Sequence, residues 1–168
     1  MKSALSLILI AFIFISCSNK KSDEEFFNEA KTNTEKGKIP EAVASYEELL
    51  KEYPDSKAAP EALRNLAAIY QNKLVKSISE TESLQEAAKL FRQIYDEYPE
   101  SEFAPMGLFM AGFVLANELN MYNEATETYN LFMEAFPDHE LAASAKEELD
   151  NMGLTPEEIL RKNFAKEE

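Results

Sequence analysis

Apolar residues recur every three or four positions along much of this chain, and short polar turns interrupt them. Between residues 42 and 53 the apolar positions lie on one face of a helix: Ala42, Val43, Tyr46, Leu49, Leu50 and Tyr53. Pro54 then ends this helix, because the residue before a proline is displaced from helical angles. A second amphipathic run follows from about residue 57 to residue 72. The pattern therefore predicts a helix, a tight turn and a second helix.

This unit is repeated along the chain. Residues 41–72 align with residues 86–117 without a gap, and a third copy begins at Glu124. In every copy an alanine precedes a proline by 12 residues: Ala42 and Pro54, Ala87 and Pro99, Ala125 and Pro137. Neither helix of a unit can bury its apolar stripe alone, so neighbouring units must stack on one another. An all-α stacked architecture follows.

Further helices are predicted at both ends of the repeats. Residues 23–39 supply an opening helix, and residues 73–85 form an extended helix end plus a loop. A mostly polar helix follows Pro137, and a short helix over residues 155–164 closes the chain. We place the repeat domain at residues 24–152 and the C-terminal short helix and tail at residues 153–168.

The repeated residues resemble tetratricopeptide repeats (TPR). The resemblance rests on the small alanine of the second helix, the aromatic four residues later (Tyr46, Phe91, Tyr129), the closing proline and the run "LRNLAAIY" at residues 63–70. The proline spacings of 45 and 38 residues exceed the family's period of about 34. The resemblance implies antiparallel helix pairs stacked as a short right-handed TPR-like solenoid of about three repeats plus C-terminal capping helices.

The first 16 residues form a separate segment. Lys2 precedes an apolar run over residues 4–15, which is too short to cross a bilayer of about 30 Å as a helix. A polar boundary follows at once. This pattern is typical of a signal peptide, removed from the mature protein.

Cys17 directly follows this segment and is the only cysteine of the chain. With Ser16 before it, the boundary resembles the signal of a bacterial lipoprotein, although Phe14 departs from the usual leucine. The resemblance implies cleavage before Cys17 and acylation of that cysteine, with palmitate among the expected chains. Residues 17–23 would then be a lipidated tether. An ordinary secreted protein and an N-terminal anchor helix are the alternatives.

The resemblance places the protein at the outer membrane, lipid-anchored and facing the periplasm. Family members retained at the inner membrane can carry aspartate after the cysteine, and Ser18 does not match that. The acidic run at residues 22–25 resembles a surface-export signal of some lipoproteins, so surface exposure is the alternative. We prefer to interpret this run as the acidic first turn of a helix, which the helix dipole favours.

The net charge of −14 restricts the partners. Phosphate backbones and anionic lipid headgroups repel such a surface, so we expect no nucleic-acid binding and no membrane attachment apart from a lipid. One cysteine excludes an intramolecular disulfide and a zinc site of several thiolates. The only histidine, His139, occupies the position of Ser56 and Ser101, where a cap or a solvated side chain is expected. No catalytic, metal-binding or cofactor motif is present, and we predict that the protein is not an enzyme.

Residues 104–117 carry a second apolar stripe opposite the packing positions. In TPR proteins the first helix of each unit lines a concave groove, so the stripe predicts an apolar floor flanked by polar side chains. The candidate groove residues are Arg64, Ala68, Gln71, Asn72, Met106, Phe109, Phe113 and Asn117. The alternative, which we prefer on sequence alone, is a central helix buried on all sides, with the 155–164 helix as one cover.

The resemblance implies a lipid-anchored envelope scaffold that binds partner proteins through its groove, in outer-membrane protein assembly or in envelope organisation. The families in question are the lipoproteins of the β-barrel assembly machinery and the coordinators of the Tol-Pal system. A lipoprotein that binds small ligands or glycans for an uptake complex is the alternative. Such binders usually carry long loops and Trp platforms, and Trp is absent here.

Overall fold

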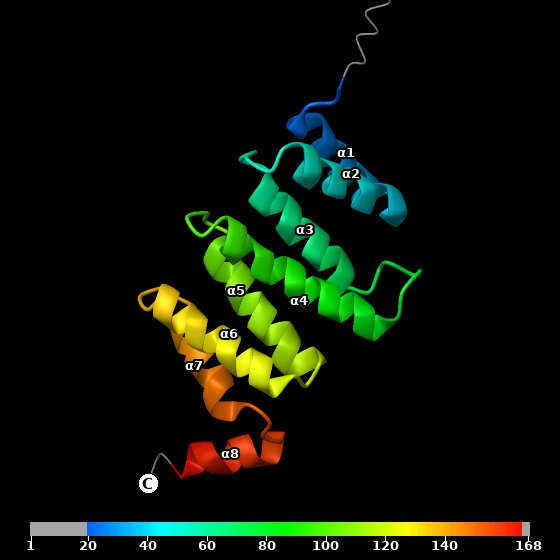
Figure 1. Cartoon of the computed structure of the whole chain (residues 1–168). Helices are drawn as coiled ribbons and strands as arrows, with labels where there is room; N and C mark the ends of the chain where they lie inside the picture. Colours follow the sequence, from blue (N-terminus) through cyan, green and yellow to red (C-terminus); the bar gives the residue numbers. More distant parts are fainter. Residues whose placement is uncertain (1–19, 166–168) are drawn as a thin grey trace, which may run out of the picture.

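The computed structural model describes residues 20–165, which form a stack of helices without any strand (Figure 1). The elements are α1 (Asp23–Glu35), α2 (Ile39–Glu52), α3 (Ala59–Gln71), α4 (Glu80–Glu97), α5 (Ala104–Phe113), the π-helical segment η1 (Val114–Glu118), α6 (Tyr122–Ala135), α7 (Ala142–Asn151) and α8 (Pro156–Phe164). Successive helices pack on one another from α1 to α7. The prediction of an all-α, TPR-like solenoid is confirmed.

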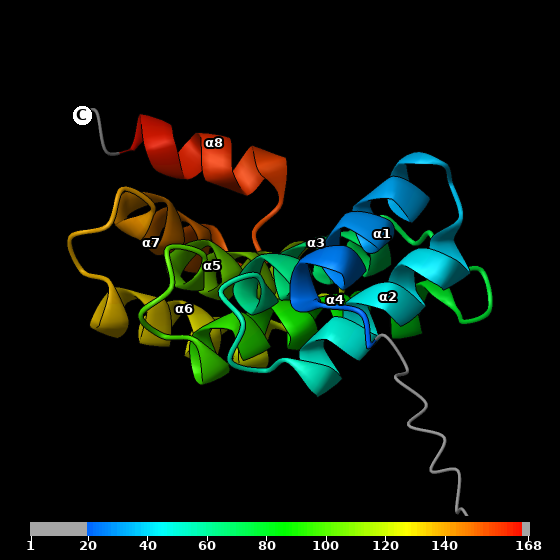
Figure 2. The same cartoon turned by 90° about the horizontal axis from the view of Figure 1, so that it is seen from above.

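The solenoid has two layers of helices (Figure 2). Helices α1, α3, α5 and α7 form one layer, and α2, α4 and α6 form the other. Helix α8 lies across the end of the stack, beyond α7 and on the side of the first layer. We call the surface of the first layer the odd-helix face.

Prolines and serines determine where the helices begin. Pro40, Pro60 and Pro105 stand in the first turns of α2, α3 and α5, where a missing N–H costs nothing. Ser22 and Ser79 each form a capping box with a glutamate three residues later. These caps start α1 and α4 at positions that tertiary packing alone would not define.

The connection between α3 and α4 corrects one sequence expectation. Residues 73–85 were expected to form an extended helix end plus a loop, but α3 already ends at Gln71. Lys73 has a φ of +55°, which ends a helix, and the Ser79 cap starts α4 at Glu80. Residues 73–79 therefore form the expected loop, and residues 80–85 belong to the beginning of α4 instead of the end of α3.

The turn after each repeat proline contains a side chain that accepts a backbone hydrogen bond. Ser56 Oγ accepts from Ala58 N–H at 3.0 Å, and Ser101 Oγ accepts from Phe103 N–H at 3.2 Å. His139 Nδ1 accepts from the N–H two residues later at 3.2 Å. The histidine is thus a turn cap, as its aligned position predicted.

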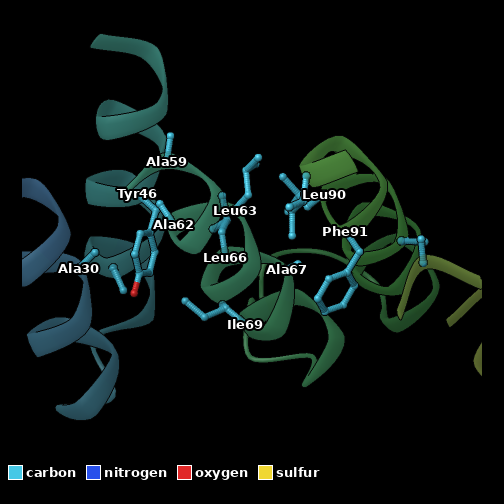
Figure 3. Packing of buried hydrophobic residues seen from close by; sticks show 14 of the residues in the cluster. Ala30, Tyr46, Ala59, Ala62, Leu63, Leu66, Ala67, Ile69, Leu90 and Phe91 are labelled. Atoms are coloured by element: carbon cyan, nitrogen blue, oxygen red, sulfur yellow. The ribbon is translucent and has the colours of Figure 1, made fainter. Parts of the chain in front are cut away.

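Two clusters of buried side chains form the core. The larger extends from Ala30 to Val114, and part of it is shown in Figure 3. The second cluster joins α5, η1, α6 and α7. The repeat alanines and aromatics are buried in all three units: Ala42, Ala87 and Ala125, with Tyr46, Phe91 and Tyr129. The small side chains let helix backbones approach, and the aromatics fill the space between units.

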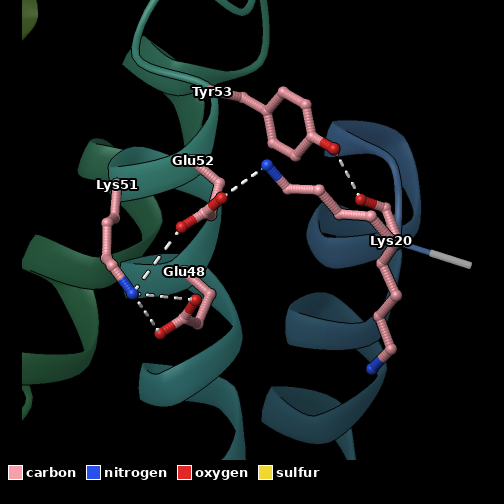
Figure 4. A network of polar contacts seen from close by, with 6 residues as sticks. Lys20, Glu48, Lys51, Glu52 and Tyr53 are labelled. Atoms are coloured by element: carbon pink, nitrogen blue, oxygen red, sulfur yellow. Dashed lines mark hydrogen bonds and ion pairs between the residues drawn. The ribbon is translucent and has the colours of Figure 1, made fainter. Parts of the chain in front are cut away.

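The N-terminal segment is bound to the end of α2 (Figure 4). Lys20 Nζ lies 2.5 Å from Glu52 Oε2, and Tyr53 Oη donates to the carbonyl oxygen of Lys21 at 2.7 Å. Ser56 Oγ donates to Asp23 Oδ2 at 2.6 Å. Residues 20–22 of the expected tether therefore contact the folded domain. The expected signal peptide (1–16) and Cys17 lie outside the described residues.

None of the helices in residues 20–165 has the length and apolarity needed to cross a membrane. The longest of them, α4, has 18 residues and carries charged side chains along its length.

The close approach of α4 and α5 depends on Gly107. A Cβ at this position would lie 2.8 Å from the Phe91 carbonyl oxygen and 2.9 Å from Ile94 Cβ. Backbone atoms of α4 cannot move away without disturbing the stack. The glycine is therefore a packing requirement within a helix, where alanine would otherwise be favoured.

We expect Gly107→Ala to lower the free energy of unfolding by about 1 kcal/mol, because overpacking of about 1–3 kcal/mol exceeds the gain in helix propensity of about 1 kcal/mol. Urea denaturation measures the difference. Ala44→Gly, at an exposed position of α2, gives the propensity contribution in this chain. Stabilisation by Gly107→Ala equal to the loss in Ala44→Gly would contradict the close contact.

Candidate partner-binding groove

The structure places all eight predicted groove residues on the first layer of helices or its ends. Three belong to α3, Asn72 follows it, three belong to α5, and Asn117 belongs to η1. Two hydrogen bonds link neighbouring elements there: Gln71 Nε2 donates to Glu118 Oε1 at 2.8 Å, and Asn117 Nδ2 donates to Glu148 Oε2 at 3.0 Å. The polar residues predicted at this edge therefore join α3 to η1 and η1 to α7.

Arg64 is engaged by its neighbours on the same face. Its guanidinium lies 3.3 Å from Glu61 Oε1 and 5.2 Å from the centre of the Phe103 ring. Its Nε atom is buried and has no hydrogen-bond partner in the described part of the chain. Ala68 is half-buried, and Asn72 is exposed, with its side-chain amide donating to the Ala68 carbonyl oxygen at 2.7 Å.

The three apolar candidates have different environments. Met106 is 42% exposed, whereas Phe113 is half-buried. Phe109 is half-buried, and its ring centre lies 5.7 Å from that of Tyr129 and 6.1 Å from that of Phe132, both on α6. Phe109 therefore contributes to the core, while Met106 faces outward.

Helix α8 does not cover this stripe completely. Met106 stays exposed, and the apolar side chains of α8 are exposed as well, with Leu160 at 57% and Phe164 at 63%. The interpretation of α5 as buried on all sides is therefore wrong. An apolar side chain therefore remains accessible in the first turn of α5.

Two cavities lie between successive helices of this face. The first, of about 270 Å³, lies between α1 and α3 and includes the predicted residues Ala68 and Asn72. The second, of about 420 Å³, lies between η1, α7 and α8 and includes the predicted residue Asn117. Both volumes are close to or within the range of known ligand pockets, about 300–1,000 Å³.

The two cavities are equivalent in the internal repeat. The offset of 83 residues that aligns Ala42 with Ala125 also aligns five lining positions. In the first cavity these are Thr34, Asn65, Ala68, Ile69 and Asn72; in the second they are Asn117, Glu148, Asn151, Met152 and Thr155. The second set contains candidate functional residues that the groove prediction did not include. An alignment of the first repeat unit with the third could have identified them from the sequence.

The repeat tyrosines of these two units are Tyr46 and Tyr129, and Tyr129 is not among the residues that line the second cavity. Tyr46 lines the first cavity; burial raises its pKa, and hydrogen bonding to Asn65 and Thr34 acts in the opposite direction. Tyr129 is completely buried, and its hydroxyl has no hydrogen-bond partner among residues 20–165. Burial and then the charge of Glu148 raise the pKa of Tyr129, so its hydroxyl stays protonated.

The described residues contain no group of three or more His, Cys, Asp or Glu side chains that could hold a metal ion. The cavities are instead lined by amides, hydroxyls, carboxylates and apolar side chains. These groups can bind a peptide segment through hydrogen bonds and apolar contacts.

The variants Phe109→Ala and Met106→Ala should distinguish a side chain in the core from one at the surface by their effect on stability. Because Phe109 packs on two buried rings, we expect its removal to lower the free energy of unfolding by about 2 kcal/mol or more. Met106→Ala should change it by no more than about 0.5 kcal/mol, as at other exposed positions. Urea denaturation followed by circular dichroism measures both. Equal losses in the two variants would refute this assignment of environments.

Comparison with known proteins agrees with the helix pairing. The tetratricopeptide repeat family model matches residues 26–56, which comprise most of α1, all of α2 and the turn after it. No curated protein matches the chain. The matched range makes α1 the first helix of a unit, so that α3, α5 and α7 are first helices too. Residues 26–56 are therefore similar to a tetratricopeptide repeat and lie within a TPR-like solenoid, a fold typical of non-catalytic scaffolds for protein–protein interaction.

Proposed function

We propose that this protein is a lipid-anchored scaffold of the bacterial envelope, and that it binds a partner protein along the odd-helix face. The observation that carries the proposal is the exposed side chain of Met106 in the first turn of α5, on the same layer of helices that carries the two cavities. An exposed apolar group on a surface that also carries polar-lined cavities is typical of a peptide-binding surface. The TPR-like fold supports a protein as the ligand.

The short sequence separation between Cys17 and the folded domain determines how the proposed lipid anchor would hold the protein. Lys20 follows Cys17 by three residues, a chain length of at most about 11 Å, and it already contacts Glu52. A lipid on Cys17 would hold the α1–α2 end of the solenoid at the membrane surface. Helices α5 and α7 would then extend away from the membrane, where partner proteins can reach them.

An envelope partner follows from this attachment. A scaffold held at the outer membrane and facing the periplasm meets other envelope proteins, so roles in outer-membrane protein assembly or envelope organisation fit the proposal. The acidic surface, with a net charge of −14, favours partner segments that carry basic residues.

Photo-crosslinking tests the binding face. We expect p-benzoylphenylalanine at position 106 to give a discrete adduct with a partner protein in cells. The same residue at position 130, exposed on α6 in the other layer, should give none. Met106→Glu should reduce the adduct formed from position 72 by about tenfold or more, since a charge replaces a desolvated apolar contact.

Identical adducts from positions 106 and 130 would argue against a face-specific site. Absence of any adduct from position 106 in a correctly localised protein would refute partner binding at the odd-helix face. Mass spectrometry of the adduct identifies the partner and tests the envelope assignment.

Replacement of Cys17 tests the anchor. We expect Cys17→Ala to abolish incorporation of an alkyne-labelled palmitate and to release the protein from the membrane fraction, because one thiol carries the stable attachment. Ser18→Ala, at the next position, should retain both. Full membrane retention of Cys17→Ala without label would show that another feature attaches the protein.

A further inference from the structure

The second cavity differs in charge from its repeat equivalent. Two carboxylates line it, Glu147 and Glu148, whereas Asn65 stands at the position equivalent to Glu148 in the first cavity. The first cavity includes one lysine, Lys31, and one carboxylate, Glu35. The same architectural position is therefore acidic at the C-terminal end of the odd-helix face and closer to neutral at the N-terminal end.

These carboxylates have no cationic partner in the described part of the chain. No ion pair within residues 20–165 involves Glu147 or Glu148; the ion pair of α7 joins Lys146 to Asp150 at 3.1 Å. Glu148 Oε2 accepts one hydrogen bond, from Asn117 Nδ2 at 3.0 Å. That bond orients the carboxylate and leaves its second oxygen able to accept another.

The rest of the lining suits a long cationic side chain. Tyr122, 41% exposed, lines the cavity and offers an aromatic face, and its hydroxyl donates to Asn120 Oδ1 at 2.9 Å. Met152 and Ile159 supply apolar surface for an alkyl stem. The amides of Asn117 and Asn151 complete a polar wall.

One contact within the chain shows that oxygen atoms at this end of α7 can bind a cationic side chain. Lys162 Nζ donates to the Asp150 carbonyl oxygen and, at 3.2 Å, to Asn151 Oδ1, and Asn151 lines the cavity.

We propose that the second cavity binds the basic side chain, arginine or lysine, of a partner segment lying along the odd-helix face. The cationic group would lie between Glu147 and Glu148, and its stem on Met152 and Ile159. A guanidinium would also stack on Tyr122 and donate to the asparagine oxygens. That the basic side chain belongs to a partner protein rests on the proposed function, whereas the binding of a basic group by the cavity does not.

Methyl NMR of the full chain in detergent micelles, labelled at Met and Ile, tests the cavity directly with N-acetyl-argininamide as the probe. We expect saturable shifts of the Met152 and Ile159 methyls that weaken as salt is added. N-acetyl-citrullinamide, a neutral isostere, should bind about tenfold more weakly or worse. N-acetyl-lysinamide separates an ammonium preference from a guanidinium preference.

Substitutions at the two carboxylates test whether they bind the argininamide probe. Glu147→Gln and Glu148→Gln should each weaken argininamide binding about tenfold, whereas Glu134→Gln, exposed on α6, should leave it unchanged. Glu147→Gln keeps the hydrogen bond between Asn117 and Glu148, so it tests charge without disturbing η1. Unchanged methyl spectra of the free variants show that they fold.

Equal shifts with argininamide and citrullinamide, or no saturable shift with either basic probe, would overturn the proposal. Argininamide binding without a crosslinked partner from position 106 would refute the proposed function alone. A crosslinked partner without argininamide binding would refute this inference alone.

Discussion

The structure depends on the stacking of helix pairs that cannot bury their apolar faces alone. Each unit places a small alanine where two helices cross and an aromatic ring four residues later, and both are buried in all three units. Each ring fills space between its own unit and the next. A single unit would leave these rings in water, so the fold is stable only as an array. Function must then use the surface that stacking leaves open.

The internal repeat also places the two cavities at equivalent positions. Tyr46 lines the first cavity, whereas the aligned Tyr129 is not among the residues that line the second. The middle unit has Phe91 at this position and no hydroxyl to place there. Architecture therefore positions the cavities, and the polar residues on the first helices give each its chemistry.

The hydrophobic periodicity was sufficient to predict the helices, their pairing and the buried repeat positions. All of these follow because each helix has a single apolar face that must be buried. The periodicity could not distinguish the environments of Met106 and Phe109, which are three residues apart and share a stripe. The difference arises because the ring of Phe109 reaches α6, whereas Met106 has no such neighbour. The candidate polar residues lie on α3, after it and on η1, in the first layer of helices, for the same periodic reason.

The π-helical segment η1 could not be predicted from a helical pattern at all. Such a segment accommodates an additional residue, and here it precedes Asn120, whose φ of +55° corresponds to that of Gly37 at +71° after α1. Because the turn after η1 keeps the position equivalent to the turn after α1, Asn117 aligns with Thr34. The start of α5 is displaced from the position that this alignment gives for the start of α1. Only packing against α4, α6 and α7 makes this arrangement favourable, and packing is absent from a one-dimensional pattern.

The end of the solenoid explains why the second cavity stays open. After α7, Gly153 adopts a φ of +75°, and Thr155 and Glu158 cap a helix that starts in a new direction. Helix α8 therefore lies across the stack on the side of the odd-helix face and does not continue the second layer (Figure 2). Ile159 becomes a wall of the cavity, and Lys162 holds the helix to the end of α7. The change of direction after α7 thus contributes a wall to the acidic cavity at the end of the odd-helix face.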